Sequence, residues 1–136
     1  MNNTVSDCKI IEIPKIIDTR GNLAVIEKDI LPFEMARVYF LYNVPAGAYR
    51  GGHAHKEQSE LLIAVSGSFK VIIKDGESQK NILLNRPDKA LLLPPGIWRE
   101  LKDFSQGSVC LVLNSGKFDE KDYIRDFSNY ISYKNI

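Results

Sequence analysis

The two histidines of this chain lie one residue apart, at His53 and His55. If this segment is a β-strand, side chains two positions apart point to the same face, so both imidazoles project into one interior. Imidazole changes its charge near neutral pH and is also a common metal ligand. The pair therefore predicts a site for proton transfer or for a metal ion.

The elements that must position this pair are typical of short strands joined by turns. Apolar or alternating β-prone segments occur at residues 8–13, 23–27, 35–43, 53–56, 60–66, 69–74, 79–84, 90–93, 98–104 and 108–114. Glycine and proline turn signals separate several of them, and Asp75-Gly76 is the strongest two-residue hairpin signal. We expect an all-β fold, a jelly-roll barrel with an open mouth and with the histidine strand facing inward.

The C-terminal tail carries a different pattern. Tyr123, Phe127 and Tyr130 recur at helical spacing. The pattern predicts one short helix over residues 119–130, with Asp119 or a neighbour near its N-terminal cap. The aromatic stripe would be the face that packs on the barrel.

Length, charge and cysteine content narrow the class of protein. The chain has 136 residues and no linker or repeat, so we expect a single domain over residues 1–136. It has 18 basic and 17 acidic residues, which gives no support for nucleic acid or an anionic membrane as a main partner. Cys8 and Cys110 fit no metal or redox spacing and weakly favour a reducing compartment. With neither a signal-peptide pattern nor an apolar stretch of transmembrane length, we expect a cytoplasmic location.

A specific motif surrounds the histidine pair. Gly47, His53, His55, Glu60 and Gly67 match the first motif of the cupin superfamily at every spacing. The stretch from Pro94 to Arg99 (PPGIWR) resembles the second cupin motif, with Arg99 where that motif has a histidine. In metal cupins, the ligands are the two histidines and the glutamate of the first motif and the histidine of the second.

The substitution at Arg99 bears on the choice between metal and proton transfer. A guanidinium cannot coordinate a metal ion, and its charge would repel a divalent cation. A site of two histidines and one carboxylate remains chemically possible. Otherwise His53 and His55 would act as acid–base groups, because the ordinary histidine pKa of about 6.5 suits proton transfer near neutral pH.

The wider chain, over about residues 10–130, resembles the bacterial dTDP-sugar 3,4-ketoisomerases. The resemblance rests on DTRGNL (18–23), RVY (37–39), RGGHAHK (50–56), PGIW (95–98) and DEKDYIR (119–125). It implies a dimeric cupin without metal or cofactor that moves the ketone of dTDP-4-keto-6-deoxyglucose from C4 to C3. Such enzymes supply 3-amino sugars for surface polysaccharides and glycoproteins.

The resemblance also implies roles for individual residues. His53 would be the base that carries the carbon proton and His55 the shuttle between oxygens, although the residues alone leave these roles interchangeable. An enediolate needs nearby donors or positive charge. Arg37 and Tyr39 share one face of a strand, so both are expected in the pocket, with Tyr39 among the catalytic candidates.

Further residues are candidates for substrate binding. Arg20 and Arg50 are expected to grip the diphosphate, because guanidinium binds phosphate oxygens in a bidentate way. Trp98 would pack against the sugar or the base, and we include Glu60 and Arg99 in the same pocket. Each has a plainer alternative: Tyr39 and Trp98 as core aromatic residues, Glu60 as a residue that orients an imidazole, and Arg20 or Arg99 as solvated side chains.

The sequence is also compatible with two other functions. One is a metal-dependent cupin enzyme, such as a dioxygenase. The other is a non-catalytic cupin that binds a nucleotide sugar.

Overall fold

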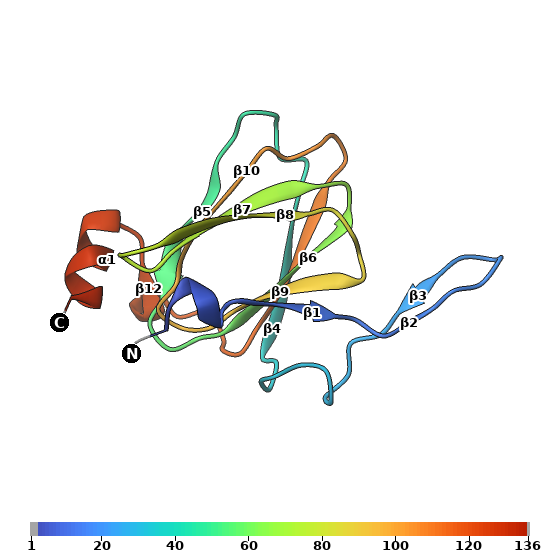
Figure 1. Ribbon diagram of the computed structural model, residues 1–136, viewed down its shortest axis with the longest axis horizontal. Coiled ribbons are helices and arrows are strands. Elements are labelled where there is room, and N and C mark those ends of the chain that lie inside the picture. The colour runs from blue at the N-terminus through green and yellow to red at the C-terminus, as the bar shows by residue number, and fades with distance from the viewer. Residues whose placement is uncertain (1–2, 136) are drawn as a thin grey trace.

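The computed structural model of the protein describes residues 3–135, which form two five-stranded antiparallel sheets and a two-stranded arm (Figure 1). The first sheet has the order β1 (Lys9–Glu12), β9 (Lys89–Leu93), β6 (Glu60–Ser66), β11 (Val109–Asn114) and β4 (Arg37–Tyr42). The second has the order β12 (Tyr123–Ile124), β5 (Arg50–His55), β10 (Trp98–Lys102), β7 (Phe69–Lys74) and β8 (Gln79–Leu84). The strand order and short connections confirm the expected all-β, cupin-like jelly roll.

The remaining elements lie outside the two sheets. The arm consists of β2 (Lys15–Ile16) and β3 (Leu23–Ala24), and Figure 1 shows it extending away from the barrel. Two single-turn 3-10 helices, η1 (Val5–Asp7) and η2 (Glu120–Asp122), and one α-helix, α1 (Phe127–Lys134), complete the described chain. None of the helices formed by residues 3–135 has the length and hydrophobicity that a membrane crossing requires.

The core lies between the two sheets. On β7, Phe69, Val71 and Ile73 are fully buried, whereas Lys70 is exposed, as the alternation in this segment predicts. They pack with residues of the facing sheet such as Leu62 on β6. Full burial of each such side chain contributes about 1.5–3 kcal/mol to stability, so this core holds the strands that carry the histidines in place.

A β-bulge in β5 shapes the approach to the histidines. His53 lies opposite Arg99 and Arg50 lies opposite Leu101, so β5 uses one more residue than β10 between these two pairs. Gly51, with a φ of 70°, supplies the left-handed conformation that such a bulge requires. Because cross-strand partners point to the same face, Arg50 and His53 both face inward although they are three residues apart.

The expected helix over residues 119–130 is wrong in its position. Asp119 caps only η2, Tyr123 lies on strand β12, and the α-helix begins at Phe127 with Asp126 as its N-cap. The helical pattern breaks because β12 pairs with β5, and the contacts of that pairing override local spacing. Phe127 and Tyr130 do pack on the barrel, against Trp98.

Candidate active site

The two imidazoles meet at the inner face of β5. The Nε2 atoms of His53 and His55 are 3.2 Å apart, and the rings are almost perpendicular, at 89°. His55 is completely buried, whereas His53 keeps 8% of its surface exposed. A contact between two ring nitrogens needs one donor and one acceptor, so one proton is shared between the two Nε2 atoms.

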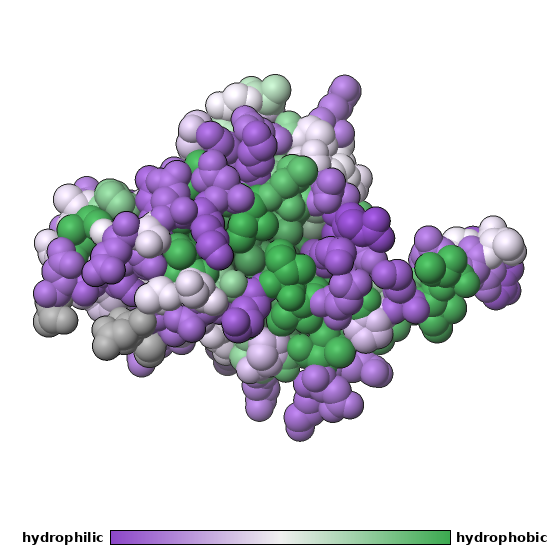
Figure 2. All heavy atoms as spheres, viewed as in Figure 1, coloured by the Kyte–Doolittle hydropathy of each residue, from purple (hydrophilic) through white to green (hydrophobic). Residues whose placement is uncertain are grey.

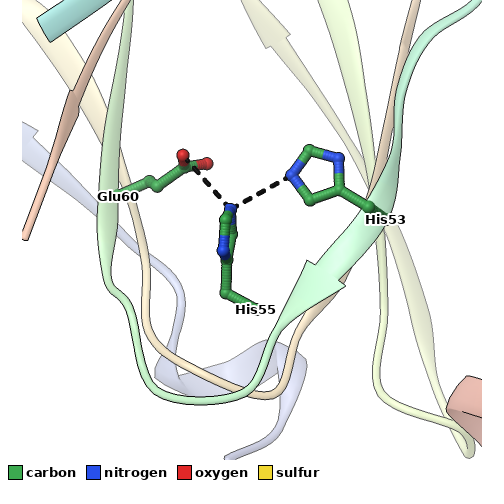
Figure 3. Close-up of side chains that lie close together, drawn as sticks. All are labelled: His53, His55 and Glu60. Atoms are coloured by element: carbon green, nitrogen blue, oxygen red, sulfur yellow. Dashed lines mark hydrogen bonds and ion pairs between the residues drawn. The ribbon is translucent and has the colours of Figure 1, made fainter. Parts of the chain in front are cut away.

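His55 is held from three sides. Its Nδ1 lies 2.9 Å from Oδ2 of Asp122, and its Nε2 lies 3.4 Å from Oε2 of Glu60 as well as facing His53. Figure 3 shows His55 between His53 and Glu60. The ring of Tyr123 packs on it with 4.4 Å between centroids. His55 therefore has a fixed orientation, with Nδ1 towards Asp122 and Nε2 towards both His53 and Glu60.

Beneath the histidines lies a buried ion pair. Nη1 of Arg99 contacts Oε1 of Glu60, and each residue is only 1% exposed. Oε2 of Glu60 also accepts hydrogen bonds from the Tyr39 hydroxyl (2.8 Å) and from Nδ2 of Asn114 (2.7 Å). Burial alone would raise the pKa of Glu60, but the Arg99 charge, the nearby His55 and the Asn114 hydrogen bond outweigh it and hold this pKa well below its usual range.

A small cavity of about 60 Å³ lies beside this polar group. Its wall includes Tyr39 and Leu41 from β4, Arg50 and His53 from β5, and the Glu60–Arg99 pair. A groove of about 270 Å³, which runs along the end of β4, shares Leu41 and Arg50 with it. The approach to His53 therefore lies between β4 and β5, with Arg50 beside it.

Several expected site residues are brought together here: His53, His55, Tyr39, Glu60, Arg99 and Arg50. Arg37 is the first residue of β4, at the end of the strand opposite the groove, and it donates to Gln58 and to the Tyr123 hydroxyl at 3.1 Å each. Its guanidinium lies over the ring of Tyr39, 5.4 Å from the centroid. Arg37 therefore supports the aromatic residues around the histidines in this structure.

Two expected binding residues are not brought to this site. Trp98 is next to Arg99 on β10 and so faces the other side, where it is buried under α1 and donates to Glu100 at 2.8 Å. The packing alternative for Trp98 fits this placement, and stacking on a substrate does not. Arg20 is exposed in the turn of the arm and pairs with Asp18 at 2.8 Å.

Three residues of the site escaped the sequence analysis: Asp122, Tyr123 and Asn114. Asp122 and Tyr123 were assigned to a helix, although both belong to one of the stretches that carry the family resemblance. Asn114 lies opposite Glu60 in the pairing of β11 with β6. One sequence signal could have indicated Asn114: it is a polar residue at the end of the apolar strand β11. It pairs with Glu60, the buried carboxylate at the start of β6.

The histidines and Glu60 do not suit a divalent metal ion, although their ligand atoms lie within 4.8 Å of one another. Both oxygens of Glu60 already accept from Arg99, Tyr39 and Asn114, and Nδ1 of His55 contacts Asp122. A metal ion at this point would lie against the guanidinium of Arg99, which is fixed by its own ion pair. This donor set fits proton transfer better than coordination.

The environment of His53 predicts how stability depends on pH. Burial, the Arg99 charge and His55 lower the pKa of His53 to about 2, so His53 stays neutral in the folded protein. Unfolded histidine has a pKa of about 6.5, so below that pH the unfolded chain binds one more proton at this residue. The free energy of unfolding should therefore fall as pH decreases from 7 towards 5, by up to about 1.4 kcal/mol per pH unit from this residue.

Urea unfolding of the wild type and of His53→Asn at several pH values in this range checks the prediction. The variant lacks the titrating group and should show a flatter profile. Equal slopes in the two proteins would contradict a neutral His53.

Comparison with known proteins gives the family. The family model described as "FdtA: WxcM-like, C-terminal" matches residues 6–135. TDP-4-oxo-6-deoxy-alpha-D-glucose-3,4-oxoisomerase of Aneurinibacillus thermoaerophilus is 40% identical over 126 residues, which cover 92% of this chain and 91% of that protein.

Two solved structures extend the comparison to the fold. A 3,4-ketoisomerase from Helicobacter canadensis superposes with a TM-score of 0.93 at 38% identity, over 96% of this chain and 98% of that one. A histidine-to-asparagine mutant of the 3,4-ketoisomerase QdtA from Thermoanaerobacterium thermosaccharolyticum, in complex with TDP-4-keto-6-deoxyglucose, superposes with a TM-score of 0.92 at 38% identity, over 95% and 94%. The chain therefore belongs to the FdtA family of cupin-fold sugar 3,4-ketoisomerases.

Proposed function

We propose that this protein converts dTDP-4-keto-6-deoxyglucose into its 3-keto isomer by proton transfer through an enediol. The observation that carries the proposal is the pair of imidazoles with Nε2 atoms 3.2 Å apart beside a cavity that His53 lines. The similarity to a relative that bears this activity in its name and to one that binds this sugar nucleotide supports the choice of substrate.

The reaction moves two protons and needs no redox cofactor. His53 removes the proton from C3 while His55, protonated at Nε2, gives a proton to O4, and the result is a 3,4-enediol. The imidazolium of His53 then returns its proton to C4, while O3 gives its proton back to Nε2 of His55 and the ketone forms at C3. Because every proton and electron pair lost at C3 and O3 is recovered at C4 and O4, the product is an isomer of the substrate.

The geometry supports a division of labour between the histidines. His53 lines the cavity and is neutral, so it has a lone pair for the C3 proton. His55 lies behind His53, and the Nε2 atoms of the two rings face each other. This position suits His55 for carrying the proton that passes between the two sugar oxygens. The Tyr39 hydroxyl, held by Glu60, supplies a fixed dipole at the cavity wall.

The sizes of the cavities favour a substrate that lies across the opening. The inner cavity of about 60 Å³ is far below the roughly 300–1,000 Å³ of pockets that enclose a ligand of drug size. We place the reacting edge of the sugar against His53 and the diphosphate near Arg50, at the junction with the groove along β4. Glu60 and Arg99 then support the site from below without binding the substrate.

The proposal can be tested by incubating the protein with dTDP-4-keto-6-deoxyglucose in deuterium oxide and a chelator, and following the sugar by NMR. We expect a 3-keto product, in which C4 carries the proton that His53 removed from C3, or a deuteron where that proton has exchanged with the solvent. No product at any protein concentration would overturn the isomerase. Tight TDP binding without turnover would instead indicate a binding protein, and turnover that depends on stoichiometric metal would indicate a metal cupin.

We also propose that the protein acts as a homodimer. Val38, Phe40 and Tyr42 are exposed along the edge strand β4, and Ile17 is 73% exposed on the arm. Figure 2 shows hydrophobic residues in the centre of one face and on the arm. Exposed apolar edges of this kind are commonly covered by a partner, and a second copy that meets the arm would bring Arg20 close to another site.

Light scattering after gel filtration should give twice the chain mass of 15.4 kDa. Ile17→Asp should shift the protein towards the monomer, because a buried charge opposes association. Leu83→Asp on β8, at a leucine that is also exposed, is the matched control and should leave the mass unchanged. A wild-type monomer at micromolar concentration would contradict the dimer.

For the biological setting we propose cytoplasmic deoxyamino-sugar biosynthesis for surface glycans. A nucleotide-linked 3-keto sugar is a suitable acceptor for an amino group at C3.

A further inference from the structure

Asp122 is placed to control the chemistry of His55. Its Oδ2 lies 2.9 Å from Nδ1 of His55, and it is itself only 8% exposed. It is the carboxylate on the side of the His55 ring that faces away from His53.

Asp122 has a fixed position. Its carboxylate accepts the backbone N–H groups of Glu57 (2.8 Å) and Gln58 (3.3 Å), and its own carbonyl accepts the N–H of Lys56 at 2.8 Å. The next residue, Tyr123, pairs with His55 across β12 and β5. The carboxylate therefore cannot turn away from His55 without breaking several hydrogen bonds.

An ionised carboxylate has acceptors only, so the contact requires a proton on Nδ1 of His55. The same proton satisfies Asp122 whether His55 is neutral or charged. Nε2 is then the nitrogen at which His55 gains or loses a proton. It faces Nε2 of His53 at 3.2 Å, and Oε2 of Glu60, 3.4 Å away, already accepts hydrogen bonds from Tyr39 and Asn114. The opposite tautomer would leave the lone pair of Nδ1 against a carboxylate.

We propose that Asp122 is a positioning residue that fixes the Nδ1–H tautomer of His55 and so reserves Nε2 for proton transfer during the isomerisation. The inference rests on the proposed function, since it assigns His55 a proton-carrying role in that reaction. Asp122 itself does not touch the substrate. Over a full cycle, His55 takes up one proton at Nε2 and releases one there, and the Nδ1–H bond to Asp122 is kept.

The tautomer can be measured directly, because His53 and His55 are the only histidines in the chain. Protein with ¹⁵N-labelled histidine has four labelled ring nitrogens, and His53→Asn leaves only those of His55. Two-bond ¹H–¹⁵N correlation spectra should show a protonated Nδ1 on His55 in both proteins. An unprotonated Nδ1 would overturn the proposal, and this result does not depend on whether the enzyme turns over.

The kinetic test uses Asp122→Asn, which keeps an oxygen for the backbone N–H of Glu57 but can present an N–H to His55. We expect part or all of His55 to shift to the Nε2–H tautomer and kcat to fall about 100-fold, with KM within about threefold. Asp119→Asn is the matched control, because it removes the same charge from an exposed residue of the same segment and should keep wild-type kcat.

The outcomes separate the two proposals. Wild-type protein without isomerase activity would overturn the proposed function, whatever the tautomer. Wild-type activity together with an unchanged kcat in Asp122→Asn would overturn the positioning role alone. A fall in kcat that Asp119→Asn shares would assign the effect to the segment and also overturn it.

Discussion

His53→Asn is expected to lower kcat about 10²–10⁴-fold, the usual contribution of a general base, while the binding of TDP stays close to that of the wild type. His53 is the imidazole that lines the cavity, and its neutral state leaves a lone pair for the proton on C3. Asparagine keeps a polar group of similar reach but cannot take up a proton near neutral pH. The measurements are the rate of 3-keto formation and the exchange of the C3 proton in deuterium oxide.

His55→Asn is the informative companion variant. If His53 is the base at carbon, His53→Asn loses both proton exchange at C3 and product formation. His55→Asn should slow product formation but retain exchange, because the carbon proton can still leave to His53. Wild-type exchange in His53→Asn would contradict the assignment, and the reverse pattern would interchange the two roles.

Arg99→Met should lower the free energy of unfolding by about 3–5 kcal/mol, the cost of leaving one member of a buried ion pair without its partner. Glu60 and Arg99 are each 1% exposed, so water cannot replace the lost guanidinium. The Tyr39 and Asn114 hydrogen bonds to Glu60 offset only part of the missing charge. Urea unfolding of the variant at neutral pH measures the loss.

The double variant Arg99→Met/Glu60→Gln tests the cause. Removing the second charge should recover a large part of the stability lost in Arg99→Met, because no uncompensated charge remains buried. Lys89→Met is the control, since Lys89 pairs with Glu12 at the surface and should change stability by less than about 1 kcal/mol. Stability of Arg99→Met within about 1 kcal/mol of the wild type would contradict the importance of the buried pair.

The strands of the central barrel were predictable because their signals are local. The segments 60–66, 69–74 and 79–84 alternate or are bounded by turn residues, and β6, β7 and β8 occupy the same ranges. Gly67, with a φ of 67°, confirms the turn expected between β6 and β7. The fold class was therefore available from periodicity and turn chemistry.

The direction of the Trp98 side chain could also have been predicted from the sequence. Trp98 and Arg99 are adjacent on one strand, so only one of them can face the interior. Both were expected in the pocket. In the structure Arg99 faces the interior of the barrel, and Trp98 packs against Phe127 and Tyr130 on the other side of the sheet. The secondary structure of the C-terminal tail was harder to predict from the sequence, because Tyr123 and Phe127 have helical spacing yet lie on two different elements.

The sequence by itself determined the chemistry that this protein has at hand: two imidazoles on one strand face, a carboxylate five residues after the second, and an arginine in place of a fourth metal ligand. These follow from residue types and the two-residue period of a strand. Only the tertiary structure decided that Glu60 forms an ion pair with Arg99, that a bulge at Gly51 turns Arg50 inward, and that Asp122 contacts Nδ1 of His55. Each of these depends on pairing between distant strands, and no local pattern specifies which distant side chains will share one buried space.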